Sequence, residues 1–261
     1  MPTELIETKR PRVSVRGWIR RGFLLWACVS TLWLANSVRT QGVGDDLMRS
    51  GEGVSVIDGA EALEFLPTLP IGRAGLVFLC GSGISARAYA PLLRPIAKAG
   101  YSVFVVKLPY RFAPFESHKQ EAMARARRVI ATHPELGHWV MSGHSLGAAL
   151  AVRLAQADQR TTDALVLVGT SHPKQDDFSF LSIPVTKIYA TNDGIAPLDR
   201  VLANRMLLPA QTAWVAIEGG NHSQFGHYGH LLFDGTATIS REAQQATTRS
   251  ILLEVLSGVA R

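Results

Sequence analysis

Three kinds of feature are scarce in this sequence of 261 residues, and each scarcity excludes a class of protein. Its two cysteines, Cys28 and Cys80, are too few for a disulfide framework, and no zinc-type spacing of cysteine and histidine occurs. The chain lacks the G-x-G-x-x-G and G-K-[ST] motifs of nucleotide binding. Of its net charge of +6, residues 1–21 hold +4, from six basic and two acidic side chains. We therefore expect no metal, no cofactor and no nucleic-acid partner.

An uncharged and mostly apolar segment, residues 22–38, follows the basic leader at residues 1–21. As a helix, its seventeen residues would extend about 25 Å, near the lower limit for crossing a bilayer. We interpret it as a transmembrane or signal segment, and the pair Arg20-Arg21 is similar to a twin-arginine export signal. Either function would anchor or export the chain and place the following domain outside the cytoplasm. A buried helix of the domain is the alternative.

Residues 39–52 are polar and contain glycine, which predicts a linker before a domain at residues 53–258. In that domain, apolar runs typical of strands alternate with segments typical of helices. This alternation predicts an α/β fold, with a mostly parallel central sheet and helices on both faces, preceded by an N-terminal hydrophobic helix. Ligands in such folds bind beyond the carboxyl ends of the strands. The predicted strands are Val54–Ile57, Glu61–Leu66, Gly75–Cys80, Ser102–Leu108, His138–Met141, Ala164–Val168, Val185–Ala190 and Ala213–Ile217, and the predicted helices are Ala86–Ala99, Glu116–His133, Ser145–Ala157, Asp199–Leu207 and Ser240–Leu256.

The stretch His138–Gly147 (HWVMSGHSLG) contains a serine-centred G-x-S-x-G motif between an apolar strand and a helix of small residues. This context is typical of a nucleophile elbow, in which a sharp turn presents the serine hydroxyl above the end of a sheet. Gly143 and Gly147 would remove Cβ atoms that otherwise collide with the neighbouring strand and helix. The N–H groups at the start of the helix favour negative charge there. Ser145 is the predicted nucleophile.

A serine nucleophile needs a histidine base and a carboxylate that orients it. With an elbow of this kind, the chain order is serine, acid, histidine. Asp193 and His222 each follow the end of a predicted strand, in that order. We therefore predict Asp193 as the acid and His222 as the base. The alternatives are that Asp193 only forms a turn in Asn-Asp-Gly, and that His227 or His230 serves as the base.

Two backbone N–H donors are needed where the attacked carbonyl oxygen becomes negative. Leu146 follows the nucleophile and supplies the first. We expect the second from Ser82 in the glycine-rich loop Gly81–Gly83, for which a plain turn is the alternative. The segment Ser171–Ile183 is the predicted lid, and its short length argues against long-chain lipid substrates.

Five stretches carry a resemblance to a known family, namely Ala86–Pro109, His138–Ala151, Ile188–Ala196, Ile217–Gly229 (IEGGNHSQFGHYG) and Asp234–Ser240 (DGTATIS). Through them the sequence resembles α/β-hydrolase-fold enzymes of the dienelactone hydrolase-like group, in particular a bacterial branch with an N-terminal hydrophobic segment. The resemblance extends over about residues 54–255. It implies that Ser145, Asp193 and His222 match the nucleophile, acid and base of the family. Dienelactone hydrolases themselves use cysteine, so dienelactone chemistry is not implied.

Together these features predict a serine hydrolase that cleaves a carboxylic ester, thioester or lactone through a Ser-His-Asp triad and an acyl-enzyme. The expected partners are a small-molecule ester-type substrate and, through the N-terminal segment, a membrane. Neither a metal nor a cofactor is required for this chemistry. One alternative is an acyltransferase that passes the acyl group to an alcohol on the same triad. The other is a non-catalytic exported binding module that keeps the fold.

Overall fold

The computed structural model of the protein describes residues 15–260, and the chain divides into two compact units, Met1–Asn36 and Ser37–Arg261. The described part of the first unit lies in helix α1 (Val15–Ser37). Residues 1–14 of the predicted basic leader fall outside the described residues.

Helix α1 contains most of the predicted transmembrane or signal segment at residues 22–38. Its uncharged part, residues 22–37, is about 24 Å long at 1.5 Å per residue, whereas the hydrocarbon core of a bilayer is about 30 Å thick. Among the described residues, no helix has both the length and the apolar character needed to cross a membrane. The prediction of a transmembrane or signal segment, with a membrane as partner, is therefore not supported. The position of the domain outside the cytoplasm stays a prediction.

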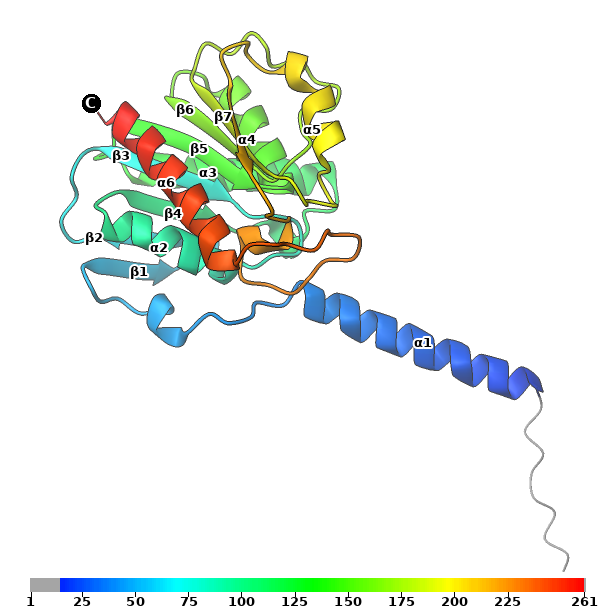
Figure 1. Ribbon diagram of the computed structural model, residues 1–261. Coiled ribbons are helices and arrows are strands. Elements are labelled where there is room, and N and C mark those ends of the chain that lie inside the picture. Colours follow the sequence, from blue (N-terminus) through cyan, green and yellow to red (C-terminus); the bar gives the residue numbers. More distant parts are fainter. Residues whose placement is uncertain (1–14, 261) are drawn as a thin grey trace, which may run out of the picture. The chain divides into compact units, whose positions relative to one another are not determined.

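The second unit is built on a sheet with the strand order β1-β2-β4-β3-β5-β6-β7-β8 (Figure 1). Strand β2 is antiparallel to both of its neighbours, and all other neighbouring strands are parallel. This arrangement confirms the predicted mostly parallel sheet. In the part of the chain that the structure describes, the strands are β1 (Val54–Asp58), β2 (Ala62–Pro67), β3 (Ala74–Leu79), β4 (Ser102–Val106), β5 (His138–His144), β6 (Ala164–Val168), β7 (Val185–Ala190) and β8 (Ala213–Ile217).

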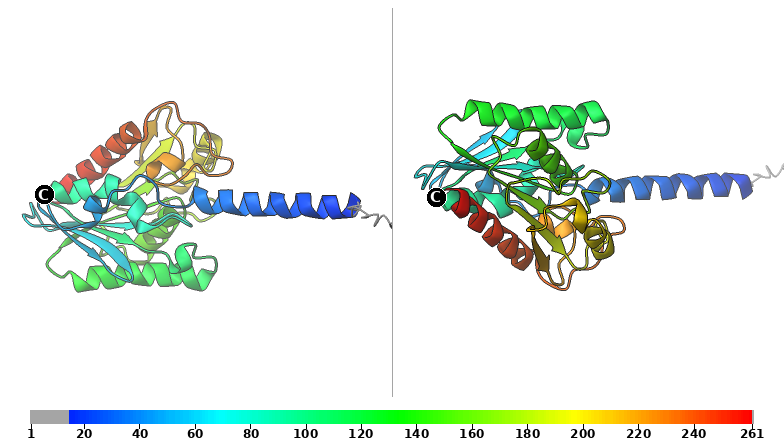
Figure 2. Two further views of the ribbon diagram at one scale, coloured as in Figure 1. Left: turned by 90° about the horizontal axis from the view of Figure 1, so that it is seen from below. Right: turned by 90° about the horizontal axis from the view of Figure 1, so that it is seen from above.

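Helices cover both faces of this sheet, as Figure 2 shows for α3 and α6. Helices α3 and α4 pack on one face, and α2 and α6 pack together on the other. Strands β3 and β6 are therefore buried along their whole length, which explains why each appears in the sequence as a continuous apolar run. The helices are α2 (Ala90–Lys98), α3 (Glu116–Thr132), α4 (Leu146–Ala157), α5 (Leu198–Ala203) and α6 (Arg241–Val259), with short 3-10 helices at Asp45–Met48, Ala86–Tyr89, Pro109–Arg111, Arg205–Leu207 and Ser223–Phe225.

Several predicted elements differ from the observed ones in extent, among them the helix predicted at Ala86–Ala99, which is a 3-10 helix followed by α2, and two further elements show the reason. Strand β5 continues to His144, three residues beyond its predicted end, because Gly143 pairs with strands on both sides of it. The predicted helix Asp199–Leu207 is instead the short α5, which ends at Ala203, followed by a separate 3-10 helix. Both differences lie at the ends of elements, where local sequence preferences are weakest.

The segment predicted as a linker, residues 39–52, is bonded to the domain. The guanidinium of Arg87 donates to the carbonyl oxygen of Val43 at 3.1 Å, and that of Arg94 donates to the carbonyl oxygen of Gly51 at 2.8 Å. The compact unit accordingly begins at Ser37, before the predicted boundary at residue 53.

One charged side chain, Lys187 of β7, is fully buried in the sheet. Its ammonium donates a hydrogen bond to the carbonyl oxygen of His172 and lies 5.6 Å from the centre of the Trp214 ring. No carboxylate pairs with it within residues 15–260. Burial lowers the pKa of Lys187 from 10.5 to about 7, because a desolvated ammonium is unfavourable.

We expect Lys187 to make the stability of the domain depend on pH. The unfolded chain keeps the lysine proton to about pH 10, whereas the folded chain releases it above about pH 7, so the free energy of unfolding rises with pH between these values. Lys187→Met should reduce this rise. Urea unfolding between about pH 6.5 and 8.5 measures it. The exposed Lys98→Met is the control and should keep the wild-type slope; an unchanged slope in Lys187→Met would contradict the assignment.

Candidate active site

Ser145 lies at a sharp turn between β5 and α4, where its backbone has φ 55° and ψ −117°. Such angles are strained for a residue with a Cβ atom and cluster at functional sites. Two glycines permit the turn. A Cβ atom on Gly143 would lie 2.4 Å from the carbonyl carbon of Gly147, and one on Gly147 would lie 2.0 Å from the carbonyl oxygen of Leu79. The crowding expected from the motif is therefore present.

Asp193 and His222 form a buried hydrogen-bonded pair. Nδ1 of His222 lies 2.8 Å from Oδ2 of Asp193, and the two side chains are 2% and 1% exposed. The other carboxylate oxygen accepts the backbone N–H groups of Ile195 at 2.8 Å and Ala196 at 2.6 Å. A carboxylate at Nδ1 favours the tautomer with its proton there, which leaves Nε2 able to accept one. The structure thus brings together the two residues predicted as acid and base.

Ser145, Asp193 and His222 follow β5, β7 and β8, so all three lie at the carboxyl edge of the sheet. The ring of His144 packs against that of His222 with their centroids 4.5 Å apart. The elbow and the loop of the histidine are therefore in direct contact. The Ser145 side chain is half-buried, and its hydroxyl makes no hydrogen bond to another described residue. In many enzymes the bond between nucleophile and base tightens only with substrate bound.

Neither of the two competing histidines forms an ion pair with a carboxylate in the described part of the chain. His230 is exposed, and its Nε2 faces the backbone carbonyl oxygen of Asp234 at 3.1 Å. His227 is half-buried beside Gly42. In the described residues, neither forms an ion pair with an acidic side chain, whereas His222 does. The geometry therefore favours His222 as the base.

The backbone N–H groups of Ser82 and Leu146 have no acceptor among the described residues. The groups on both sides of Ser82 are used: Gly81 donates to a tyrosine hydroxyl at 3.0 Å, and Gly83 donates to the carbonyl oxygen of Arg111 at 2.7 Å. The loop is thus fixed around Ser82 while the N–H of Ser82 stays available. An available N–H in an ordered loop is what an oxyanion hole requires.

The tyrosine that holds the loop, Tyr89, also contacts His144. Its hydroxyl accepts the N–H of Gly81 and lies within hydrogen-bond distance, 3.0 Å, of Nδ1 of His144. Burial, and secondarily the neighbouring His222, holds the pKa of His144 well below its ordinary value. A neutral imidazole therefore packs against the ring of His222.

Asp234 is a site residue that the sequence did not reveal. Its carboxylate accepts the backbone N–H groups of His222 at 3.2 Å, Ser223 at 2.8 Å and Gly194 at 3.2 Å, and the hydroxyl of Ser223 at 2.6 Å. It therefore joins the loop of Asp193 to the loop of His222. Its signals in the sequence are the dipeptide Asp234-Gly235, which by itself predicts no more than a turn, and its place in the stretch Asp234–Ser240 that carries the family resemblance.

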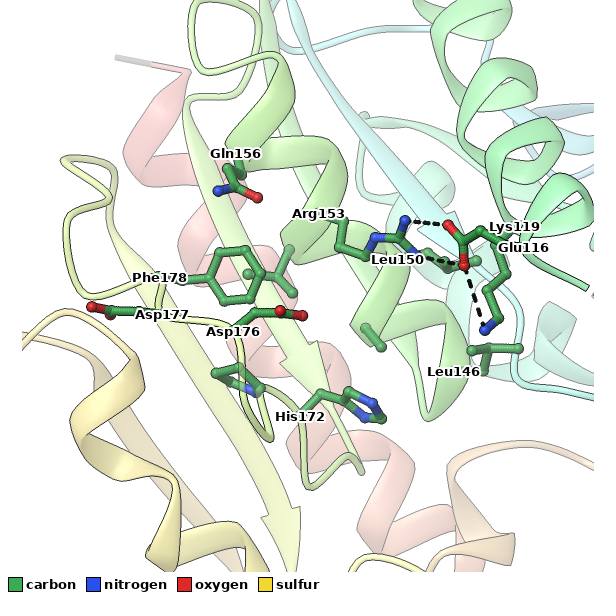
Figure 3. A pocket seen from close by; sticks show the side chains of 13 residues that line it. Glu116, Lys119, Leu146, Leu150, Arg153, Gln156, His172, Asp176, Asp177 and Phe178 are labelled. Atoms are coloured by element: carbon green, nitrogen blue, oxygen red, sulfur yellow. Dashed lines mark hydrogen bonds and ion pairs between the residues drawn. The ribbon is translucent and has the colours of Figure 1, made fainter.

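A groove of about 600 Å³ begins at Leu146, beside the elbow, and runs along α4 (Figure 3). Arg153 forms a salt bridge with Glu116 and holds the pKa of that carboxyl at about 2. His172 lies at the same end as Leu146, and burial lowers its pKa to about 4, so it is neutral at pH 7. Residues of the predicted lid form one wall. The lining residues are Glu116, Lys119, Leu146, Ala149, Leu150, Val152, Arg153, Gln156, His172, Pro173, Asp176, Asp177 and Phe178.

We expect Asp234→Asn to loosen both loops, because an amide nitrogen cannot accept the N–H groups that one carboxylate oxygen now accepts. The free energy of unfolding should fall by about 2 kcal/mol. Urea unfolding measures this loss, and faster hydrogen exchange in residues 221–224 would locate it. Asp199→Asn, in an exposed position of α5, is the matched control and should change neither quantity. Unchanged exchange in Asp234→Asn would contradict the bracing role.

Comparisons with known proteins bear on the fold and the family. A family model described as "Alpha/beta hydrolase family" matches residues 75–246. No curated protein sequence matches the chain.

Several solved structures share the fold. An alpha/beta hydrolase enzyme from a sediment metagenome of the lagoon of Mar Chica, Morocco, is 14% identical over 78% of this chain and 98% of its own, with a TM-score of 0.59. An arylesterase is 14% identical over 91% of this chain and 98% of its own, with a TM-score of 0.57. A ferulic acid esterase from Streptomyces cinnamoneus is 19% identical over 74% of this chain and 68% of its own, with a TM-score of 0.58. At these identities the likeness concerns the fold.

Proposed function

Because this chain belongs to the alpha/beta hydrolase family, we propose that it is a serine hydrolase that cleaves a carboxylic ester, thioester or lactone. The observation that carries the proposal is the buried pair of His222 and Asp193, 2.8 Å apart, at the same sheet edge as Ser145 on its strained turn. Such a pair supplies the oriented base that a serine hydroxyl needs for attack.

In the proposed reaction, Oγ of Ser145 forms a bond to the substrate carbonyl carbon while Nε2 of His222 takes the hydroxyl proton. The negative charge on the carbonyl oxygen is stabilised by the N–H groups of Leu146 and Ser82. His222 then gives its proton to the leaving alcohol or thiol as the carbon–heteroatom bond breaks, leaving an acyl-enzyme. Water attacks this intermediate by the same steps, and His222 again transfers the proton. Asp193 stabilises the protonated ring throughout.

Two kinds of support favour an ester as the substrate. Among the solved structures of similar fold are an arylesterase and a ferulic acid esterase, although one fold can host several activities. The groove beside Leu146 provides room for the acyl part of such a substrate. Charged residues of α3, α4 and the lid segment line this groove. Such walls favour a short or polar substituent over a long alkyl chain, because charged groups would lose water against it.

We expect Ser145→Ala to abolish both ester hydrolysis and covalent labelling by a fluorophosphonate probe. Asp193→Asn should retain the fold but reduce kcat by about 10³- to 10⁴-fold, because the histidine loses its orienting carboxylate. Mass spectrometry of the labelled protein identifies the modified residue, and p-nitrophenyl acetate reports turnover. Wild-type protein that is folded yet neither labelled nor active would refute the proposal and favour a binding module.

The charged groove predicts a preference for short acyl chains. The value of kcat/KM should be highest for p-nitrophenyl acetate or butyrate and at least about 10-fold lower for the dodecanoate. A long alkyl chain would take water from the charged groups that line the groove. A series of p-nitrophenyl esters measures this directly. Arg153→Met removes one charge from the groove wall and frees Glu116. It should leave folding and kcat for the acetate unchanged, and it should reduce the discrimination against the longer acyl chains. A preference for the dodecanoate in the wild type would contradict the assignment of the groove.

A further inference from the structure

The segment 38–45, called the strap below, crosses the loops of the candidate active site. It lies at the start of the second compact unit and overlaps the predicted linker. One end is fixed by Arg87, which forms a salt bridge with Asp45 and donates to the carbonyl oxygen of Val43 at 3.1 Å. The strap is therefore attached to the domain independently of its contacts with the site.

On one side, the strap reaches the oxyanion loop through Arg111. The guanidinium of Arg111 donates to the carbonyl oxygen of Val38 at 3.2 Å, and the carbonyl oxygen of Arg111 accepts the N–H of Gly83 at 2.7 Å. In addition, a Cβ atom on Gly83 would lie 3.3 Å from Cγ1 of Val38, so the two segments are in close contact. Ser82, whose N–H is the proposed donor, directly precedes Gly83.

On the other side, the strap reaches the loop of the base. Thr40 forms an antiparallel bridge with Tyr228, and the N–H of Gln41 donates to the carbonyl oxygen of His227 at 2.9 Å. The hydroxyl of the buried Tyr228 donates to the carbonyl oxygen of His222 at 3.0 Å. One residue, Tyr228, thus links the strap to the loop of the base on this side, as Arg111 links it to the oxyanion loop on the other.

The loop that carries Arg111 depends on outside contacts for its shape. Tyr110, Arg111 and Ala113 have φ values of 52°, 63° and 44°, which non-glycine residues rarely adopt. Strained residues of this kind persist only where surrounding contacts over-determine them. The bond from Arg111 to the strap is one of those contacts, and the bond from Ser82 Oγ to the carbonyl oxygen of Phe112 at 3.1 Å is another.

We propose that the strap is a positioning element of the catalytic site, which holds the oxyanion loop through Arg111 and the loop of His222 through Tyr228. This inference rests on the proposed function and assigns a role to a segment outside the triad. Arg111 is the positioning residue on which the oxyanion side depends. Oxyanion donors act only when they are preorganised at the reacting oxygen, so a looser loop lowers kcat and leaves the binding of the ground state little changed.

The test compares Arg111→Met and Arg111→Lys with the wild type in the full chain. Loss of a complete oxyanion donor reduces kcat by about 10²- to 10³-fold, so a loosened donor should reduce it by about 10-fold in Arg111→Met, with KM within about twofold. Arg111→Lys should restore part of the loss, because an ammonium can still donate to Val38. Active sites are counted by fluorophosphonate labelling, so that misfolded protein does not contribute. Arg127→Met, which removes an exposed ion pair with Asp158, is the matched control and should keep wild-type kcat.

A second pair of variants tests the base side. Gln41→Pro removes the N–H that donates to His227, whereas Gln41→Ala keeps it. The proline variant should lower kcat and speed hydrogen exchange in residues 222–228 by more than the alanine variant does, because only the proline removes the backbone donor.

Hydrogen exchange separates the two proposals from one another. Faster exchange of residues 81–85 in Arg111→Met, together with the lower kcat, supports the strap. Unchanged kcat and unchanged exchange in an active, labelled enzyme would overturn the strap proposal and leave the hydrolase intact. Wild-type protein that is neither labelled nor active would instead overturn the proposed function, and the catalytic role of the strap with it.

Discussion

The close approach of helix α4 to the end of strand β3 is the constraint on which the candidate site depends. A Cβ atom on Gly147 would lie 2.0 Å from the carbonyl oxygen of Leu79 and 2.5 Å from that of Cys80, so the backbones touch without an intervening side chain. This contact fixes the start of α4, and with it the strained conformation of Ser145. It also fixes the place where the chain leaves β3 and enters the loop of Ser82. One contact therefore positions both the predicted nucleophile and the proposed second oxyanion donor.

The buried pair of Asp193 and His222 imposes a second requirement, because a charged group in the interior is tolerated only when its hydrogen bonds are complete. Asp193 meets it with two backbone N–H groups in addition to the histidine. Asp234 accepts N–H groups from both loops that carry the pair and so holds these loops at a fixed distance from each other. The carboxylate network at this edge thus fixes the geometry of the two loops, because a buried ion pair by itself adds little to the stability of a fold.

The sequence predicted the parts of the site that have a local signature. Ser145 stands in a glycine-framed turn, and Asp193 and His222 directly follow apolar strands. Strand periodicity and residue type were therefore sufficient to predict that all three lie at one edge of the sheet. Asp234, Tyr89 and Arg111 have no such signature, because their partners lie in loops that only the folded sheet brings together. The N-terminal segment shows the opposite case, in which a strong local pattern suggested a membrane span, whereas no described helix has both the length and the apolar character needed to cross a membrane. The mostly parallel pairing of the sheet followed from the alternation of strands and helices, whereas the order of the strands came only from the structure.

The contacts that hold the catalytic geometry and the residues that line the groove come from different parts of the domain. Three segments brace the catalytic geometry. They are the strap, the strained loop at residues 110–113 that follows β4, and Asp234, which follows β8. The groove is formed by α3, α4 and residues 172–178. Leu146 joins the two parts, because its side chain lines the groove and its backbone N–H is the proposed first oxyanion donor. Substitutions in the groove can therefore change which substrate fits without altering the distances among nucleophile, base and oxyanion donors. A fold organised in this way separates specificity from catalysis, which explains how one sheet and one elbow can serve hydrolases of different substrates.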